Sequence, residues 1–409
     1  MSDTPVRRWP GHVVQHLKDM AIDADEYLEA ANRRFDAKFG FNRPRHVAAY
    51  RAFADAGGVE LFGRVLADAP VGGPKEDDGW WDNLLNTYRR FENDVVAGAR
   101  IKAQFRNTSA EATTDNDGYY RVRIATDATP DDLLWDNATI SLADGSLLTP
   151  QPVLQVGAVA KFGVISDIDD TVLQSSITDW KTAAQLTFLH NARTRKPLQG
   201  VAKLYQALQT GADGAGRNPI FYVSSSPWNL YDLLEDFLEL NAIPHGPIFL
   251  RDLGLEEGKF IKTPGHGHKL ERARELIQRL PQLRWVLIGD SGQADAELYA
   301  EAAREFGDRI LAIYIRDVDL EAETARDTYV DGFIEKIAGT GVPMLRVADS
   351  VAIAEHARGL GLVADAHIAG ITAEVRRDQN RPTLGEAAGD AAKESAKTSI
   401  EDAVAPLKK

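Results

Sequence analysis

A short apolar run near the middle of this chain ends directly in a cluster of acidic residues. Phe162-Gly163-Val164-Ile165 is followed by Ser166 and then by Asp167-Ile168-Asp169-Asp170-Thr171. Aspartate is disfavoured in strands, and clustered carboxylates repel one another and cost free energy to desolvate. A divalent cation such as Mg²⁺, which prefers hard oxygen ligands, relieves that cost. The pattern predicts a buried strand with a metal site at its end, although an acidic turn that caps a strand also fits it.

The region around this cluster alternates between apolar runs and amphipathic stretches. We expect strands at 162–166, 219–224, 247–250, 284–289 and 310–315. We expect helices at 199–209, 228–241, 267–280, 294–306 and 349–359. Such alternation is typical of a parallel α/β sheet with helices on both faces, and ligands bind such sheets at the carboxyl ends of the strands. We therefore expect a Rossmann-like α/β domain over residues 159–365.

Three further regions flank this domain. Residues 1–43 are expected to form an N-terminal helical segment, in which a one-sided helix at 11–38 packs on the protein. Short alternating strands joined by turn residues predict a β-sandwich-like domain over 44–158, with a helical insertion near 77–91. The C-terminal tail, 366–409, is rich in Ala, Lys, Glu and Asp, which predicts a mobile or marginal helix.

The composition of the chain excludes several classes of protein. It contains no cysteine, which excludes disulfides, thiolate metal sites and cysteine nucleophiles. Its net charge of −14 argues against nucleic-acid binding and against adhesion of the whole surface to anionic lipid. No apolar run is long enough to cross a membrane, and the first residues lack the apolar core of a signal peptide. We expect a cytoplasmic protein, and a peripheral membrane contact through a local basic patch stays open.

Polar residues stand where the predicted strands end. Ser224 ends one strand, Asp290 follows another with Asp295 close behind it, and Lys269 opens a predicted helix. Acidic clusters, a hydroxyl and an ammonium at one sheet edge suit phosphoryl transfer, in which catalysis is mostly positioning and charge neutralisation. Each residue also has a plain structural reading. Ser224 alone reads as a turn residue, Lys269 as a solvated lysine, and Asp295 as an acid at a helix N-terminus.

These motifs, in this order, resemble those of the haloacid-dehalogenase superfamily. Five patches are similar more narrowly to the App1-type phosphatidate phosphatase catalytic domain, over roughly residues 160–340. The patches are Ser166-Asp167-Ile168-Asp169-Asp170-Thr171-Val172, Tyr222-Val223-Ser224-Ser225-Ser226-Pro227-Trp228, Leu250-Arg251-Asp252, His268-Lys269 and Ile288-Gly289-Asp290-Ser291-Gly292-Gln293. The chain departs from the pattern at Ser225, where many members have Asn, and at Ala294-Asp295-Ala296-Glu297, where an Asp-Pro-Glu run is usual.

The resemblance implies a Mg²⁺-dependent phosphatase with a sheet of the haloacid-dehalogenase type. Asp167 would attack phosphorus and form an aspartyl-phosphate. Asp169 would protonate the leaving alkoxide and then take a proton from water. Asp167, Asp290 and the main-chain carbonyl of Asp169 would hold the Mg²⁺.

The resemblance also assigns supporting residues. Ser224 would bind a phosphoryl oxygen, Lys269 would neutralise charge beside Asp167, and Asp295 would orient Lys269 or a metal-bound water. The candidates for contact with substrate are Thr171, Ser225, Arg193, Arg195 and Arg251, although Thr171 is expected chiefly to fix the turn. His268 is interpreted as a loop or cap residue, because no partner lies at a zinc-binding spacing.

The substrate implied by the resemblance is phosphatidate, which would yield diacylglycerol and phosphate. The segment 172–198 is too short for a large cap domain, and an open site accepts bulky substrates. A phosphatase for a soluble phosphoester or a phosphoprotein is the alternative within the same chemistry. A non-catalytic binding module is a second alternative, against which the intact acidic residues and Lys269 argue. No feature of the sequence identifies a protein partner.

Overall fold

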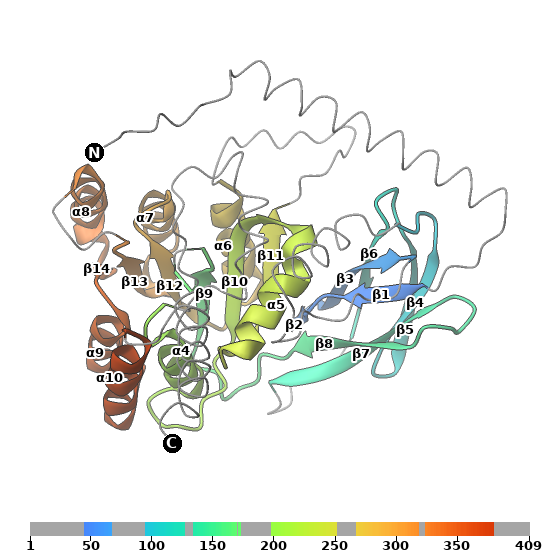
Figure 1. The fold of residues 1–409 in the computed structure, drawn as a ribbon, viewed down its shortest axis with the longest axis horizontal. Coiled ribbons are helices and arrows are strands. Elements are labelled where there is room, and N and C mark those ends of the chain that lie inside the picture. The colour runs from blue at the N-terminus through green and yellow to red at the C-terminus, as the bar shows by residue number, and fades with distance from the viewer. Residues whose placement is uncertain are drawn as a thin grey trace, which may run out of the picture.

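A computed structural model of the protein describes two sheets and the helices that cover one of them (Figure 1). The described residues are 45–67, 95–126, 134–169, 171–172, 198–251, 267–318 and 324–379. The predicted helix at 11–38, the helical insertion near 77–91, Arg193 and Arg195 lie outside them. None of the helices within the described ranges has the length and hydropathy that a membrane span requires.

Sheet A is the N-terminal sheet. Its strands are β1 (His46–Ala49), β2 (Ala52–Asp55), β3 (Gly58–Leu66), β4 (Arg100–Phe105), β5 (Thr108–Thr113), β6 (Tyr119–Ile124), β7 (Trp135–Leu142) and β8 (Thr149–Leu154). Side chains alternate between buried and exposed along β4 and β6, as expected for a sheet with one covered face. Buried side chains from several strands, such as Leu61 of β3, Phe105 of β4 and Ile140 of β7, form one core.

The predicted β-sandwich is in fact one continuous, curled sheet. Its strand order is β1-β3-β2-β8-β7-β4-β5, with β6 paired to β3. The pairing of β2 with β8 is parallel and joins the two halves, which a sandwich would keep apart. This pairing links segments that are far apart in the chain, so the local strand pattern carries no sign of it.

Sheet B is the parallel sheet that the sequence predicts. Its strands are β9 (Phe162–Asp167), β10 (Ile220–Pro227), β11 (Ile248–Arg251), β12 (Arg284–Asp290), β13 (Ile310–Arg316) and β14 (Met344–Val347). All pairs are parallel, and the order β11-β10-β9-β12-β13-β14 is that of a doubly wound α/β sheet. The strand order reverses between β9 and β12, which is where such sheets bind ligands.

Helices cover both faces of sheet B (Figure 1). One face carries α4 (Val201–Thr210), α5 (Tyr231–Leu240), α9 (Ser350–Gly359) and α10 (Asp365–Gln379). The other carries α6 (Gly267–Arg279), α7 (Asp295–Phe306) and α8 (Ala325–Ile337). Neighbouring residues of a strand serve opposite faces, since Val164 lies in the first core and Ile165 in the second.

Helix α10 extends the α/β unit beyond residue 365, where the sequence analysis ends it. Ile371 belongs to the core on the α4 face, Ile368 packs against that core, and Val375 is buried. Their spacing places all three on one helix face. The first part of the predicted C-terminal tail, through residue 379, is therefore a packed helix of this unit.

Candidate functional site

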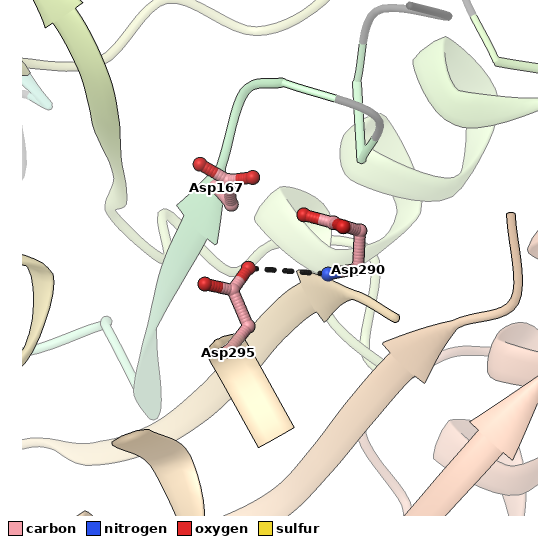
Figure 2. Close-up of side chains that lie close together, drawn as sticks. All are labelled: Asp167, Asp290 and Asp295. Carbon is pink, nitrogen blue, oxygen red and sulfur yellow. Dashed lines mark hydrogen bonds between the residues drawn. The ribbon is translucent and has the colours of Figure 1, made fainter. Parts of the chain in front are cut away.

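The acidic residues predicted from the sequence meet at the carboxyl edge of sheet B. Asp167 is the last residue of β9, Asp290 is the last residue of β12, and Asp295 begins α7. Figure 2 shows the three side chains converging, and one carboxylate oxygen from each lies within 4.8 Å of the others. All three are fully buried. Because β9 and β12 are the neighbours at which the strand order reverses, this is the position expected for a ligand site.

Asp295 is already engaged on both oxygens. Its Oδ2 accepts a hydrogen bond from the Asp290 backbone N at 3.2 Å, and its Oδ1 accepts one from Lys269 Nζ at 2.8 Å. Gly289 permits this approach, because a Cβ there would lie 2.5 Å from Asp295 Oδ2. Asp295 thus holds Lys269 and the end of β12 in place, which makes it a positioning group more than a ligand.

Lys269 places a buried ammonium among these carboxylates. Its Nζ lies 2.8 Å from Asp167 Oδ1, in an ion pair that lacks hydrogen-bond geometry, and 3.1 Å from Gln293 Oε1. Burial disfavours the ammonium, but the carboxylates of Asp167 and Asp295 outweigh it and raise the pKa of Lys269 well above its usual value. The lysine is therefore charged at neutral pH.

The negative charge of the cluster exceeds what Lys269 balances. Burial raises the pKa of the Asp167 carboxyl well above its usual range, Lys269 lowers it in part, and Asp295 and Asp290 raise it again. Both Asp167 oxygens are buried without a hydrogen-bond partner among the described residues. Buried carboxylates of this kind need a cation or a proton. Since hard oxygen donors suit divalent cations, the triad could bind a metal through Asp167 and Asp290.

The second motif lies on a bulge of strand β10. The pairing of β10 with β11 shifts register between Val223 and Pro227, which leaves Ser224, Ser225 and Ser226 as a bulge. We call these three residues the β10 bulge. Ser224 Oγ donates a hydrogen bond to Asp169 Oδ2 at 2.8 Å and accepts one from Ser226 N at 3.0 Å. The hydroxyl predicted to bind a phosphoryl oxygen therefore faces Asp169 in this structure.

Three further hydroxyls of the motifs are buried and make no hydrogen bond with the described part of the chain. They are Thr171 Oγ1, Ser225 Oγ and Ser226 Oγ. An unsatisfied buried hydroxyl costs free energy, so such groups mark places where a polar ligand is expected. A polar ligand at these hydroxyls would relieve that cost.

Comparison with known proteins identifies this α/β unit. The family described as "Phosphatidate phosphatase APP1, catalytic domain" matches residues 162–317. That range contains every site residue described above. The chain carries an App1-type catalytic domain. Sheet A and α10 lie outside the matched range.

Two curated relatives match part of this chain. Phosphatidate phosphatase APP1 of Saccharomyces cerevisiae is 31% identical over 228 residues, which cover 54% of this chain and 37% of that protein. An uncharacterised protein of Schizosaccharomyces pombe is 32% identical over 168 residues, 41% of this chain and 26% of that protein. The matches thus span about a third of the yeast protein's length and a quarter of the other's.

Among solved structures, a ferredoxin-NADP+ reductase from Plasmodium falciparum aligns with 74% of this chain and 95% of its own, with 8% identity and a TM-score of 0.17. That score is too low to bear on the fold.

Among the predicted site residues that the structure describes, Arg251 lies on the strand furthest from Asp290 on the β11 side of the sheet. It ends β11, the edge strand beyond β10, and is half-buried. Its charge contributes to a lowered pKa of His268. The structure thus places Arg251 beside the second motif, separated by strands β10 and β9 from Asp290.

Two residues to which the sequence assigned no role at the site contact the motifs of the App1-type domain. His268 Nε2 lies 2.9 Å from the Ser224 carbonyl oxygen, and burial is the main cause that lowers its pKa to about 4. Because a carbonyl only accepts, neutral His268 must carry its proton on Nε2. Gln293 binds Lys269, and its backbone N donates to Asp290 Oδ1 at 2.9 Å. Their positions next to Lys269 and Asp290 in the sequence were the available signal.

Proposed function

We propose that this protein is a Mg²⁺-dependent phosphomonoesterase of the haloacid-dehalogenase superfamily that hydrolyses phosphatidate to diacylglycerol and phosphate. The observation that carries the proposal is the buried Asp167 carboxylate, which lies beside Lys269 and Asp290 and accepts no hydrogen bond from the described residues. The App1-type match over residues 162–317 and the name of the yeast relative supply the substrate class. A cytoplasmic location with peripheral membrane contact belongs to the same proposal, because phosphatidate resides in membranes.

The first step is nucleophilic attack by Asp167. One Asp167 oxygen forms a bond to phosphorus while the bond from phosphorus to the glycerol oxygen breaks. Asp169 gives its proton to the departing oxygen, which leaves as the hydroxyl of diacylglycerol. The hydrogen bond from Ser224 Oγ to Asp169 Oδ2 would orient the Asp169 carboxyl group for this transfer.

The second step regenerates the free carboxylate. Water attacks the phosphorus of the aspartyl-phosphate, Asp169 takes a proton from that water, and the bond between phosphorus and Asp167 breaks to release phosphate. Lys269, held by Asp295, stabilises the negative charge beside Asp167 in both steps. The Ser225 and Thr171 hydroxyls would donate to the phosphoryl oxygens.

A bound divalent cation would reduce the repulsion between Asp167 and the anionic substrate. Asp167, Asp290 and the main-chain carbonyl of Asp169 are the groups we propose for it. Two of these are the buried carboxylates described above, which fit the oxygen preference of Mg²⁺.

Phosphate release tests the proposal. Phosphatidate in mixed micelles and a panel of soluble phosphoesters are compared with Mg²⁺ and with a chelator. We expect Mg²⁺-dependent release with preference for phosphatidate, and a loss on the order of 10³-fold or more in Asp167→Asn. Asp308→Asn, on the exposed surface, is the matched control and should keep full activity. Activity that survives in Asp167→Asn would contradict the mechanism, and preference for a soluble ester would contradict the substrate.

A further inference from the structure

The β10 bulge continues directly into an aromatic cluster that sheet A shares with the App1-type domain. Trp228 opens a short 3-10 helix, η1 (Trp228–Leu230), immediately after the bulge and Pro227. Its buried ring stacks on Tyr50 with ring centroids 5.1 Å apart, and it makes a T-shaped contact with Phe62 with centroids 4.7 Å apart. Phe62 lies on β3 and Tyr50 lies between β1 and β2, so the sheet A region contacts the chain four residues after Ser224.

Tyr50 is held firmly on the sheet A side. It lies between β1 and β2, where the backbone leaves the strand ladder. Gln151 Nε2 donates hydrogen bonds to the backbone oxygens of Tyr50 at 2.6 Å and Phe62 at 2.8 Å. Gln151 is fully buried and accepts in turn from Tyr120 Oη at 3.2 Å. A buried network with satisfied partners is rigid, so the aromatic contact is set by the sheet A core.

Helix α5 anchors the same segment from the other side. The Arg51 backbone N donates to Tyr231 Oη at 2.7 Å, and the Arg51 side chain pairs with Glu235. The Tyr50 and Tyr231 rings lie 4.2 Å apart. These contacts fix Tyr50 relative to the helix that follows Trp228.

Residues 50–53 also pack against both faces of sheet B at the edge formed by β10 and β11. Tyr50 belongs to the hydrophobic core on the α4 and α5 face, whereas Phe53 belongs to the core on the α6 face. The Phe53 ring meets Phe221 of β10 at 5.4 Å and Phe249 of β11 at 6.2 Å. Contacts on both faces prevent this segment from sliding across the edge strands.

We propose that Tyr50, with Phe62, positions the reactive groups of the App1-type domain through Trp228. The aromatic stack fixes the chain after the β10 bulge, the bulge fixes Ser224, and Ser224 orients Asp169. Sheet A thereby acts on proton transfer although it contributes no group to the acidic cluster. This inference rests on the proposed phosphatase function and gives the N-terminal sheet a role in it.

The proposal makes a prediction about the leaving group. An alkyl oxygen needs a proton as it departs, whereas p-nitrophenolate is stable without one, so misplacing Asp169 harms alkyl esters more. In Tyr50→Leu, kcat/KM should fall by about ten-fold or more for dioctanoyl phosphatidate and by about two-fold for p-nitrophenyl phosphate. A general loss of folded protein would lower both values by the same factor.

Three variants serve as comparisons. Tyr50→Phe keeps the ring and should match the wild type on both esters, since the structure records no hydrogen bond from the Tyr50 hydroxyl among the described residues. Phe62→Leu, at a half-buried position, removes the second ring and should repeat the selective loss if Tyr50→Leu does not fold. Phe105→Leu disturbs the sheet A core without touching Trp228 and should leave the ratio between the two esters unchanged.

A measurement without turnover separates this inference from the proposed function. Hydrogen exchange of the peptide spanning residues 222–230 should accelerate in Tyr50→Leu and stay at the wild-type rate in Phe105→Leu. Equal losses on both esters, or unchanged exchange in this peptide, would overturn the positioning role. If the wild type hydrolyses neither ester, the phosphatase proposal fails and the proposed control of proton transfer fails with it. The exchange result then decides only whether Tyr50 holds the bulge.

Discussion

Lys269 faces the buried carboxylates of Asp167 and Asp295 at 2.8 Å each, while Asp290 completes the same cluster. Removing one member of a buried ionic group leaves the others without compensation, which costs more than the group itself contributes. The balance of charge at this site is therefore a matter of stability as well as of catalysis.

In Lys269→Met the carboxylates lose their ammonium. We expect the free energy of unfolding without divalent cations to fall by about 3–5 kcal/mol, and added Mg²⁺ to restore part of it, because only the folded state holds the site. Urea denaturation with Mg²⁺ and with a chelator measures both. Lys102→Met, at an exposed position of sheet A, should be neutral. Unchanged stability of Lys269→Met in chelator would contradict the charge argument.

The neutral His268 predicts a pH effect on folding. Its pKa is lowered from about 6.5 to about 4 in the folded state, so the unfolded chain binds the extra proton first as pH falls. The contribution of His268 to the free energy of unfolding is fully present above about pH 6.5. As the pH falls toward 4, up to about 3 kcal/mol of the free energy of unfolding is lost. Denaturation between these pH values should show a slope that flattens in His268→Gln. An equal slope in both proteins would assign the effect to other groups.

At the scale of elements, side chains of α10 cap the N-terminus of α4. Helix α4 begins after Gly200 with no side-chain cap and no acidic residue in its first turn. Two buried carboxylates of α10 supply the missing cap and the missing negative charge. Asp378 Oδ2 accepts from Gly200 N at 3.0 Å, and Glu374 Oε2 accepts from Lys203 N at 2.7 Å. Both lie at the positive end of the α4 dipole.

Neutralising these carboxylates should weaken the α/β unit. We expect Glu374→Gln and Asp378→Asn to lower the free energy of unfolding by about 1–2 kcal/mol each, as for the loss of a helix cap. Thermal or urea denaturation is the measurement. Glu355→Gln, on an exposed face of α9, is the matched control. An unchanged free energy of unfolding in both variants would show that α10 packs here without capping α4.

At the scale of the whole molecule, an ionic network ties sheet A to the helix that carries Lys269. Arg279, in the last turn of α6, lies 2.6 Å from Asp55 of β2 and 3.0 Å from Glu60 of β3. Its guanidinium also lies 4.2 Å from the Phe53 ring. The first turn of α6 thus carries Lys269 at the site, and its last turn forms ion pairs with sheet A.

Arg279→Met tests this junction. The half-buried charged hydrogen bonds predict a loss of about 1–3 kcal/mol in the free energy of unfolding. Arg274→Met is the control, since Arg274 pairs with Glu271, Glu301 and Glu305 on the surface of the App1-type domain alone. We expect Arg274→Met to lower the free energy of unfolding by about 0.5–1 kcal/mol. Equal losses in the two variants would mean that the junction adds nothing beyond a surface pair.

Much of sheet B follows from local sequence, because parallel strands buried on both faces appear as continuous apolar runs. The exceptions are β14, a four-residue edge strand that contains Arg346, and α8, whose first turns are polar. For sheet A the sequence predicted short alternating strands over 44–158, but it predicted neither strand β8 nor the parallel pairing of β2 with β8 that makes the sheet continuous. That pairing joins residues about a hundred positions apart, as Ala52 and Val153 show.

The sequence alone determined which chemical groups stand at the strand ends, because strand patterning and the rule for parallel sheets bring Asp167, Ser224 and Asp290 to one edge. Only the tertiary structure decided what each group faces. Ser224 turns to Asp169 and Asp295 to Lys269, since a bulge and contacts between distant segments set side-chain direction. The stacking of Tyr50 on Trp228 was also decided only by the tertiary structure, because residue spacing within one segment does not indicate where another segment packs.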